Sequence, residues 1–222
     1  MIEIAIDGPA ASGKGALGKK LSDKYNFPYL DTGILYRKVA YELIKNNIKN
    51  SENLEILCCN FAKKLNLKEF KNKNLRTEDV AKLASKIATF PNLRKILNNK
   101  QKEFSNFNKK EFGGCILDGR DIGTTILPNA DFKFFITASI EVRAKRRLLQ
   151  KNISFLHEND EKCMLHTLIN DIKERDKLDS NRKTSPLVPA KDAHVIDTTI
   201  INCQELLLIV TNIIEGKNEL LK

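Results

Sequence analysis

The residues with the clearest chemistry form a glycine-rich segment with one lysine, Gly8-Pro9-Ala10-Ala11-Ser12-Gly13-Lys14-Gly15. It follows the alternating apolar run 1–6 and precedes a helix-permissive stretch, so the order strand, loop, helix is predicted. In such a loop, backbone N–H groups and the N-terminus of the next helix surround a site for polyphosphate oxygens. Lys14 adds a mobile positive charge over the outer phosphates. A glycine-rich turn can arise by chance, but its place after a buried strand favours phosphate binding.

Most other candidate residues are Lys and Arg, and the three histidines share no motif. Phosphoryl transfer needs two phosphates held in line, with cations that neutralise charge on the transferred group. It requires neither a carboxylate nucleophile nor a histidine base. Cys163 and His166 have a helical i, i+3 spacing, but no further ligands lie near them in the sequence, so we expect no metal site built from side chains.

The composition limits the class of protein. A chain of 222 residues with 41% hydrophobic content can bury one core, with or without an insert. The net charge of +10 favours an anionic partner, which could be a nucleotide, a nucleic acid or an acidic surface. Lysines scattered among asparagines, as in 45–49 and 71–73, are typical of a solvated face. Five cysteines without CxxC spacing indicate a reducing compartment. No signal peptide or membrane-spanning run is evident, so we expect a cytoplasmic protein without a membrane partner.

Short apolar runs alternate with segments of helical periodicity. This alternation predicts an α/β fold in which a five-stranded parallel sheet is covered by helices on both faces. Residues 48–110 differ, because they are rich in Lys and Asn and carry helical periodicity without a strong strand, which indicates an inserted helical subdomain. The predicted strands are 1–6, 28–31, 115–117, 132–136 and 194–197, and the predicted helices are 17–25, 34–44, 75–88, 92–104, 139–149, 161–178 and 203–214.

Four separated motifs occur in order, and together they resemble the bacterial cytidylate kinases, which are nucleoside monophosphate kinases of the phosphate-loop class. The resemblance covers nearly the whole chain, including the tail 186–190 with Asp192 and Ala193. It implies a core formed by 1–47, 111–151 and 187–222, an acceptor-binding insert at 48–110 and a mobile lid at 152–186. The motifs are Gly8 to Ala16, Asp31-Thr32-Gly33-Ile34-Leu35-Tyr36-Arg37, Asp118-Gly119-Arg120-Asp121-Ile122-Gly123-Thr124, and Ile172-Lys173-Glu174-Arg175-Asp176 with Asp179 and Arg182.

The resemblance implies transfer of the γ-phosphate of ATP to CMP or dCMP with Mg2+. It also implies that residues Gly8 to Ala16 bind ATP and that the catalytic set contains Lys14, Asp118, Arg120, Arg175 and Arg182. In the family pattern two arginines grip the acceptor phosphate with help from a hydroxyl, here Arg37, Arg120 and Thr32. The same pattern implies that the lid arginines, here Arg175 and Arg182, close over the phosphates of both nucleotides, while the aspartate, here Asp179, meets the acceptor ribose. The metal ion is held mainly by nucleotide oxygens and water, with Asp118 reaching it through water.

Base choice follows from hydrogen-bonding chemistry once the resemblance places Ser85, Arg94 and Asp121 against the base. Cytosine presents an amino donor and an unprotonated ring nitrogen, so an Asp acceptor and an Arg donor favour it. Uracil would present a carbonyl to the Asp121 carboxylate and a ring N–H to Arg94, so both protein groups would be unpaired or repelled. Without the resemblance, the sequence favours Arg94 as a helix-surface charge and Ser85 as a small helix-packing residue.

Two departures from the family pattern are visible. Ala16 stands where relatives commonly have Thr or Ser, so one hydroxyl contact to the donor is missing. The stretch from Cys59 to Arg76 is shorter than in many relatives and lacks a clear hairpin.

Three alternatives remain open at this point. A kinase of the same fold could act on another small acceptor, such as UMP, AMP or shikimate. A nucleic-acid-binding ATPase is suggested by the net charge, although the arginines fall in motif positions and the excess lysines are scattered. A non-catalytic nucleotide-binding module is the third. We expect a monomeric enzyme that acts on CMP and dCMP and has no nucleic-acid partner.

Overall fold

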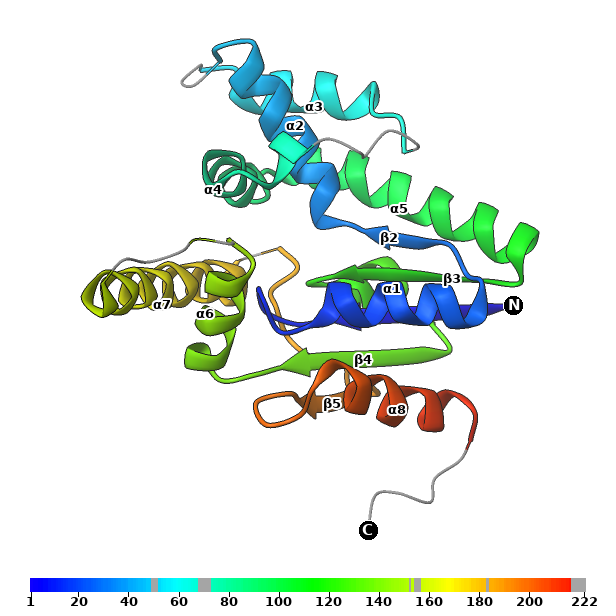
Figure 1. The fold of residues 1–222 in the computed structure, drawn as a ribbon. Helices are drawn as coiled ribbons and strands as arrows, with labels where there is room; N and C mark the ends of the chain where they lie inside the picture. Colours follow the sequence, from blue (N-terminus) through cyan, green and yellow to red (C-terminus); the bar gives the residue numbers. More distant parts are fainter. Residues whose placement is uncertain (49–51, 68–72, 152, 154–156, 183, 217–222) are drawn as a thin grey trace. The chain divides into compact units, whose positions relative to one another are not determined.

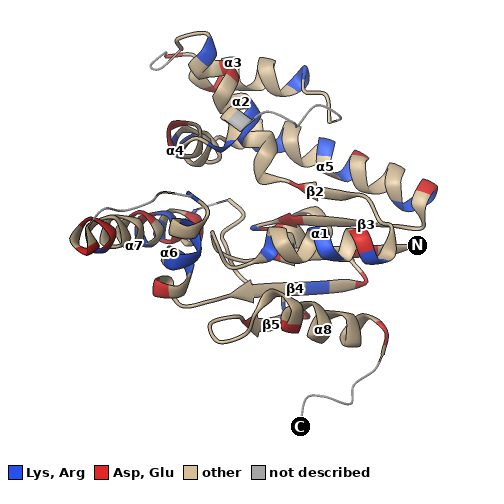
Figure 2. Cartoon of the chain, in the orientation of Figure 1, with Lys and Arg blue, Asp and Glu red and all other residues tan. Residues whose placement is uncertain are grey.

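The computed structural model describes residues 1–48, 52–67, 73–151, 153, 157–182 and 184–216 (Figure 1). The chain divides into two compact units, which are treated separately below. The first unit consists of Met1–Tyr29 and Asn108–Lys222, and the second consists of Leu30–Phe107. Lys and Arg occur on helices of both units (Figure 2). Among the described residues, no helix is both long enough and apolar enough to span a membrane.

The chain has a five-stranded sheet with the order β2-β3-β1-β4-β5, and strands β1, β3, β4 and β5 of this sheet belong to the first unit. Strand β1 pairs in parallel with both β3 and β4, and β4 pairs in parallel with β5. The predicted five-stranded parallel sheet is therefore confirmed. Residues that follow β1, β3 and β4 lie at the carboxyl edge of this sheet. The strands are β1 (Ile2–Asp7), β2 (Tyr29–Asp31), β3 (Gly114–Gly119), β4 (Phe132–Thr137) and β5 (His194–Asp197).

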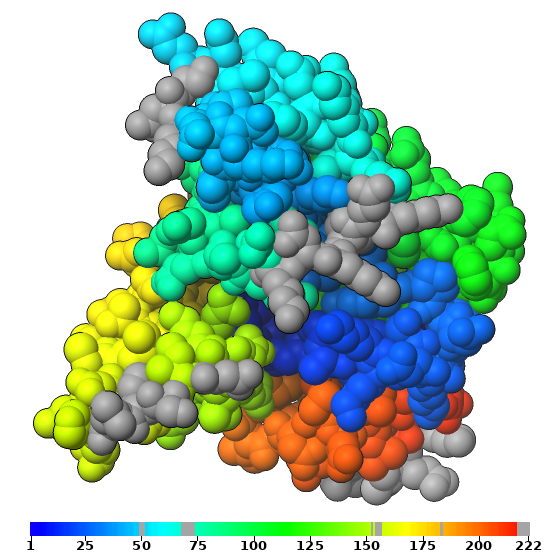
Figure 3. Space-filling model, turned by 45° about the horizontal axis from the view of Figure 1, so that its top comes forward, coloured from blue at the N-terminus to red at the C-terminus, as the bar shows by residue number. Residues whose placement is uncertain are grey.

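Helices α1 (Lys14–Tyr25) and α8 (Cys203–Ile214) pack side by side on one face of the sheet (Figures 1 and 3). Their apolar residues form a cluster with alternate residues of the central strands, in agreement with the period of two along a strand. The residues that point to the other face, such as Ala5 and Leu117, are also fully buried, so both faces are covered. The cluster contains Ile4, Ile6, Leu17, Leu21, Ile116, Phe134, Ile136, Leu206 and Val210.

Helix boundaries in this unit follow local capping rules. Helix α1 ends at Asn26 in a left-handed conformation (φ 53°), as the Asn-Phe-Pro stop signal predicts. Helix α6 (Ile140–Leu149) begins after Ser139, whose Oγ accepts a hydrogen bond from the Val142 amide. Helix α8 begins with a capping box formed by Asn202 and Glu205.

Helix α7 (Glu158–Ser180) begins three residues earlier than the predicted 161–178 segment and ends two residues later. Its first turn carries Glu158, Asp160 and Glu161, and negative charge there is favourable to the helix dipole. It packs against α6 through Ala144, Leu148, Leu168 and Ile172.

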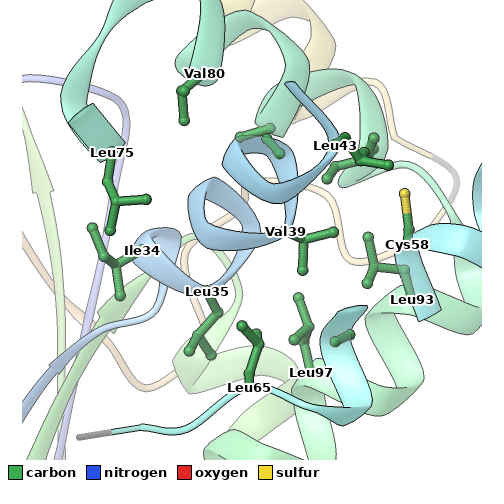
Figure 4. Packing of buried hydrophobic residues seen from close by; sticks show 14 of the residues in the cluster. Ile34, Leu35, Val39, Leu43, Cys58, Leu65, Leu75, Val80, Leu93 and Leu97 are labelled. Carbon is green, nitrogen blue, oxygen red and sulfur yellow. The ribbon is translucent and has the colours of Figure 1, made fainter. Parts of the chain in front are cut away.

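The second unit is helical and has its own core (Figure 4). The predicted stripe of Leu35, Val39 and Leu43 is fully buried there. Further core residues include Cys58, Leu75, Val80, Leu93 and Leu97. The elements are α2 (Gly33–Lys45), α3 (Leu54–Lys63), η1 (Lys73–Arg76), α4 (Glu78–Ile87) and α5 (Pro91–Phe112), whose last turns belong to the first unit.

Two predicted boundaries in this unit are wrong. The helix predicted over 75–88 begins only at Glu78, because 73–76 form a 3-10 turn and Thr77 is extended. Pro91 opens α5, where a missing N–H has no cost, and the helix continues eight residues beyond the predicted end at 104.

Candidate active site

The segment Gly8 to Ala16, called the phosphate loop here, connects β1 to α1 at the carboxyl edge of the sheet. Gly8 has φ +145°, and an added Cβ would lie 2.0 Å from the carbonyl oxygen of Ile136, so only glycine fits. Ala11 and Gly13 also have positive φ values, of 59° and 103°. Lys14 is buried, and its Nζ donates to the carbonyl of Pro9 at 2.8 Å, which holds the ammonium over the loop.

The outward-facing carbonyls of the loop are bonded to side chains from other segments. Arg143 Nη1 donates to the Ala10 carbonyl at 3.4 Å, and Arg146 Nη1 donates to the Ser12 carbonyl at 3.5 Å. Thr198 Oγ1 also lies 3.0 Å from the Ser12 carbonyl, and it is held in turn by Arg146 Nη1 at 2.8 Å. Because donors from other segments lie at these carbonyls, the conformation of the loop is supported from outside the loop itself.

These three supporting residues were not among the predicted site residues. The sequence indicated that α6 carries Arg143 and Arg146, but gave them no role. A faint signal existed in the close spacing of arginines on one short helix. Thr198 had no signal, since a threonine after an edge strand is common. Arg143 additionally donates to Asp176 Oδ2 of α7 at 2.6 Å, which ties the loop's support to the helix that bears the predicted lid residues.

Asp118 lies near the end of β3 beside the first turn of α1. Its Oδ2 accepts a hydrogen bond from the Tyr29 hydroxyl at 2.8 Å. An added Cβ at Gly15 would lie 3.5 Å from the same oxygen, so this carboxylate closely approaches the phosphate loop. The ring of Tyr29 rests on Gly18, where an added Cβ would come within 2.4 Å of Cε2. Tyr29 thus orients Asp118, and Gly18 makes room for Tyr29.

The Asp179 carboxylate contacts two of the arginines that the sequence predicts to be in the site. Arg120 Nε donates to Asp179 Oδ2 at 2.8 Å, and Arg182 Nη2 lies 3.4 Å from Oδ1. Burial alone would raise the pKa of Asp179, but the charges of Arg120, Arg182 and Arg175 outweigh it and hold the pKa below its ordinary value. The carboxylate is therefore ionised at neutral pH and keeps the guanidinium groups together.

Arg175, Asp179 and Arg182 have the spacing i, i+4 and i+7, which predicts one shared helical face, and this prediction is only partly correct. Arg175 and Asp179 lie on α7, but the helix ends at Ser180, so Arg182 is not at a helical i+7 position. Arg182 still reaches Asp179, because its Nε donates to the Asp179 carbonyl at 3.2 Å in the turn after the helix.

Asp121 is buried at the start of a single π-helical turn, η2 (Ile122–Ile126), which sequence periodicity did not indicate. The Asp121 carbonyl accepts hydrogen bonds from the amides of Thr125 and Ile126 at 2.9 and 3.2 Å. Because Arg120 directly precedes Asp121, the two side chains are placed by the same few backbone atoms.

The second unit carries the other predicted acceptor residues. Thr32 is buried immediately before α2, and Arg37 on that helix donates from Nη1 to the Leu75 carbonyl at 3.1 Å. Arg94 is only 3% exposed, donates to the Ala88 carbonyl at 3.1 Å and lies 5.9 Å from the centre of the Tyr36 ring. A buried arginine over an aromatic ring is not a helix-surface charge. Ser85 is half-buried on α4.

Within the first unit, therefore, the structure brings together the phosphate loop, Asp118, Arg120 and the group around Asp179, at the carboxyl edge of a parallel α/β sheet. This is where open α/β sheets bind their ligands. A first strand that leads into a glycine-rich loop with a buried lysine is typical of phosphate-loop nucleotide-binding proteins.

The comparisons with known proteins narrow that class. The sequence model of the cytidylate kinase family matches residues 4–216. The chain is 40% identical over 212 residues to the cytidylate kinase of Bartonella tribocorum, covering 96% of this chain and 94% of that protein. It is 41% identical over 219 residues to the cytidylate kinase of Methylocella silvestris, covering 99% and 96%. The chain belongs to the cytidylate kinase family and is a nucleoside monophosphate kinase.

A solved structure shares the fold. An uncharacterized protein from Eubacterium ventriosum superimposes with a TM-score of 0.51 over 97% of this chain and 99% of that chain, at 16% identity. At this low identity the likeness concerns the fold alone.

Proposed function

We propose that the chain transfers the γ-phosphate of ATP to CMP or dCMP, with Mg2+ on the donor, to give CDP or dCDP. The observation that carries this proposal is the match of the whole chain to the cytidylate kinase family, together with a phosphate loop whose carbonyls are held by Arg143, Arg146 and Thr198. A loop fixed in this way needs little conformational reorganisation when the donor binds.

The donor half of the reaction uses the phosphate loop. Its amides bind the β- and γ-phosphates, and Lys14 neutralises charge on the transferred group. Asp118 fits a hydrated divalent cation, because its carboxylate lies beside the loop and is oriented by Tyr29. The cation supplies charge neutralisation between the phosphates. Ala16 offers no hydroxyl, so donor affinity depends more heavily on the backbone amides.

The acceptor phosphate is bound by guanidinium groups. Arg120 and Arg37 bind its oxygens bidentately, and the Thr32 hydroxyl adds one donor. Arg175 and Arg182, from the lid at 152–186, complete the neutralisation when the lid closes and excludes water. Asp179 already holds Arg120 and Arg182 in place, and it can also accept a hydrogen bond from the acceptor ribose.

The base is selected by Asp121, Arg94 and Ser85. The Asp121 carboxylate accepts from the exocyclic amine of cytosine, and Arg94 donates to the unprotonated ring nitrogen. Burial of Arg94 supports this role, since its charge is retained inside the acceptor-binding insert at 48–110.

The experiment that tests the proposal measures ADP formation with CMP, dCMP, UMP and AMP in parallel. We expect turnover with CMP and dCMP at a high ratio over the other two. A preference for AMP would refute the assignment of the base site. Dependence on added RNA or DNA, without dependence on CMP, would refute the kinase proposal itself. We expect the active species to be a monomer by sedimentation.

A further inference from the structure

Asp7 is a buried acidic residue to which neither the motifs nor the proposed chemistry assigns a role. It is the last residue of β1, directly before the phosphate loop, and it is 4% exposed. Its strand is central, and in register Asp7 lies opposite Gly119 of β3 on one side and Phe135 of β4 on the other. It therefore sits between the phosphate loop and the segment that begins at Arg120.

The carboxylate of Asp7 bonds to two consecutive backbone amides. Oδ1 accepts from the Ile122 amide at 2.8 Å, and Oδ2 accepts from the Gly123 amide at 2.7 Å. These amides open η2, and the bonds inside that turn run from later amides to the Asp121 and Ile122 carbonyls. The first amides of such a turn need a partner from elsewhere. Asp7 supplies one for each, from 115 and 116 residues away in the sequence.

The small size of Gly123 suits this close approach. An added Cβ there would lie 3.4 Å from Asp7 Oδ2 and 3.3 Å from Cδ of Lys133. Glycine thus lets the backbone lie against the carboxylate with little free space. Because η2 follows Arg120 and Asp121 directly, whatever fixes its first amides also fixes the backbone of those two residues.

We propose that Asp7 is a positioning residue for the acceptor nucleotide: its ionised carboxylate holds the amides of Ile122 and Gly123, and so sets Arg120 and Asp121 relative to the phosphate loop. The inference rests on the proposed acceptor roles of Arg120 and Asp121. Asp7 contacts neither nucleotide in this mechanism. It acts through the backbone, and loss of its charge removes one of its two acceptor oxygens.

The electrostatic surroundings make this charge sensitive to pH. Burial raises the pKa of Asp7 to about 6, with a further rise from Asp121, while the bonds from Gly123 and Ile122 and the charge of Lys14 lower it. From β4, the stem of Lys133 lies near Gly123, but its ammonium is bound to Asp192 at 2.6 Å. Since the folded pKa exceeds the ordinary value of 3.8, the free energy of unfolding falls as pH rises from about 4 to 6. The Asp7 carboxylate is thus charged at neutral pH, although its ionisation lowers the free energy of unfolding.

The test compares D7N with the wild-type protein at several pH values. Asparagine resembles the protonated carboxyl, with one acceptor and one donor end. We expect D7N at pH 8 to raise KM for CMP about tenfold, as expected for loss of one charge-assisted hydrogen bond, with a smaller effect on KM for ATP. The ratio of wild-type to D7N kcat/KM for CMP falls toward one by pH 5. Titration of the CMP phosphate affects both proteins and cancels in this ratio.

The matched control is D131N. Asp131 Oδ2 accepts the Glu3 amide at 2.8 Å, which is the same type of bond at the opposite end of β1. We expect this variant to keep the wild-type KM for CMP at all pH values. A D7N deficit that is independent of pH, or that affects ATP as strongly as CMP, would overturn the inference, as would an unchanged KM for CMP.

A measurement on the wild-type protein avoids any folding defect of the variant. The carboxyl carbon of Asp7 and the amide protons of Ile122 and Gly123 are followed by NMR against pH, with and without saturating CMP. We expect one common midpoint, which CMP shifts to lower pH because binding and ionisation are linked. An unshifted midpoint would contradict the positioning role. The D121N variant distinguishes failure of the proposed acceptor site from failure of the role of Asp7. If D121N leaves the selectivity for CMP unchanged, the proposed acceptor site is refuted. If D121N changes the selectivity but D7N leaves the KM for CMP unchanged, only the role of Asp7 is refuted.

Discussion

The contact between Gly18 and Tyr29 predicts that G18A changes the stability of the protein in opposite directions with and without the Tyr29 ring. Gly18 lies inside α1, where alanine normally stabilises a helix over glycine by roughly 0.5–1 kcal/mol. Here the added Cβ would come within 2.4 Å of Cε2 and 2.9 Å of Cδ2 of Tyr29, so the ring must move. Overpacking of this kind costs about 1–3 kcal/mol. G18A should therefore destabilise the wild-type protein by up to about 2 kcal/mol.

In a Y29A background the ring is absent and only the helix propensity remains. G18A should then stabilise the protein by roughly 0.5–1 kcal/mol. The four proteins of this double-mutant cycle are compared by urea unfolding at constant m-value. If G18A has the same effect with and without the Tyr29 ring, the ring is not the reason for glycine at this position. Movement of the ring also shifts the hydroxyl that bonds to Asp118, so G18A should lower kcat in the wild-type background.

Three further predictions concern the charges and the loop. The pKa of Asp179 is lowered in the folded protein, so its ionisation stabilises the fold above the ordinary pKa of 3.8, and this contribution is lost as the pH falls through the lower folded pKa. D179N should therefore be less stable than the wild-type protein at pH 7. The stabilities of the two proteins, followed by circular dichroism, should converge in strongly acidic solution. Thr198→Val removes the hydroxyl beside the Ser12 carbonyl and should raise KM for ATP severalfold, with little effect on KM for CMP in steady-state assays. Ala16→Thr should tighten ATP binding in calorimetry with little change in preference for CMP; unchanged ATP affinity would count against a role for the missing hydroxyl.

The fold was largely predictable because its signals are local. Apolar runs followed by glycine or aspartate located the strands, and Asn26 with Pro28 located the end of α1. The two failed boundaries are the start of α4, where a 3-10 turn at Lys73–Arg76 precedes the helix, and the end of α5, which continues past 104 to Phe112 and ends before Gly113 with its positive φ of 75°.

The site was predictable in its motif residues but not in their support. Arg143, Arg146 and Thr198 bond to loop carbonyls 133 to 186 residues away, and no spacing rule relates such positions. The η2 turn depends on Asp7 in the same way, so its five residues look like an ordinary loop in the sequence. The position of Arg182 beyond the end of α7 was missed because helical spacing was extended past Ser180.

The most direct test of the assigned activity is a competition assay with CMP, UMP and AMP at equal concentrations and limiting ATP. The ratio of products gives the ratio of kcat/KM values in a single mixture. Cytosine selection by Asp121 and Arg94 predicts that CDP forms in large excess over UDP and over ADP derived from isotopically labelled AMP, at every time point before ATP is exhausted. Comparable amounts of CDP and UDP, or an excess of AMP phosphorylation, would contradict it.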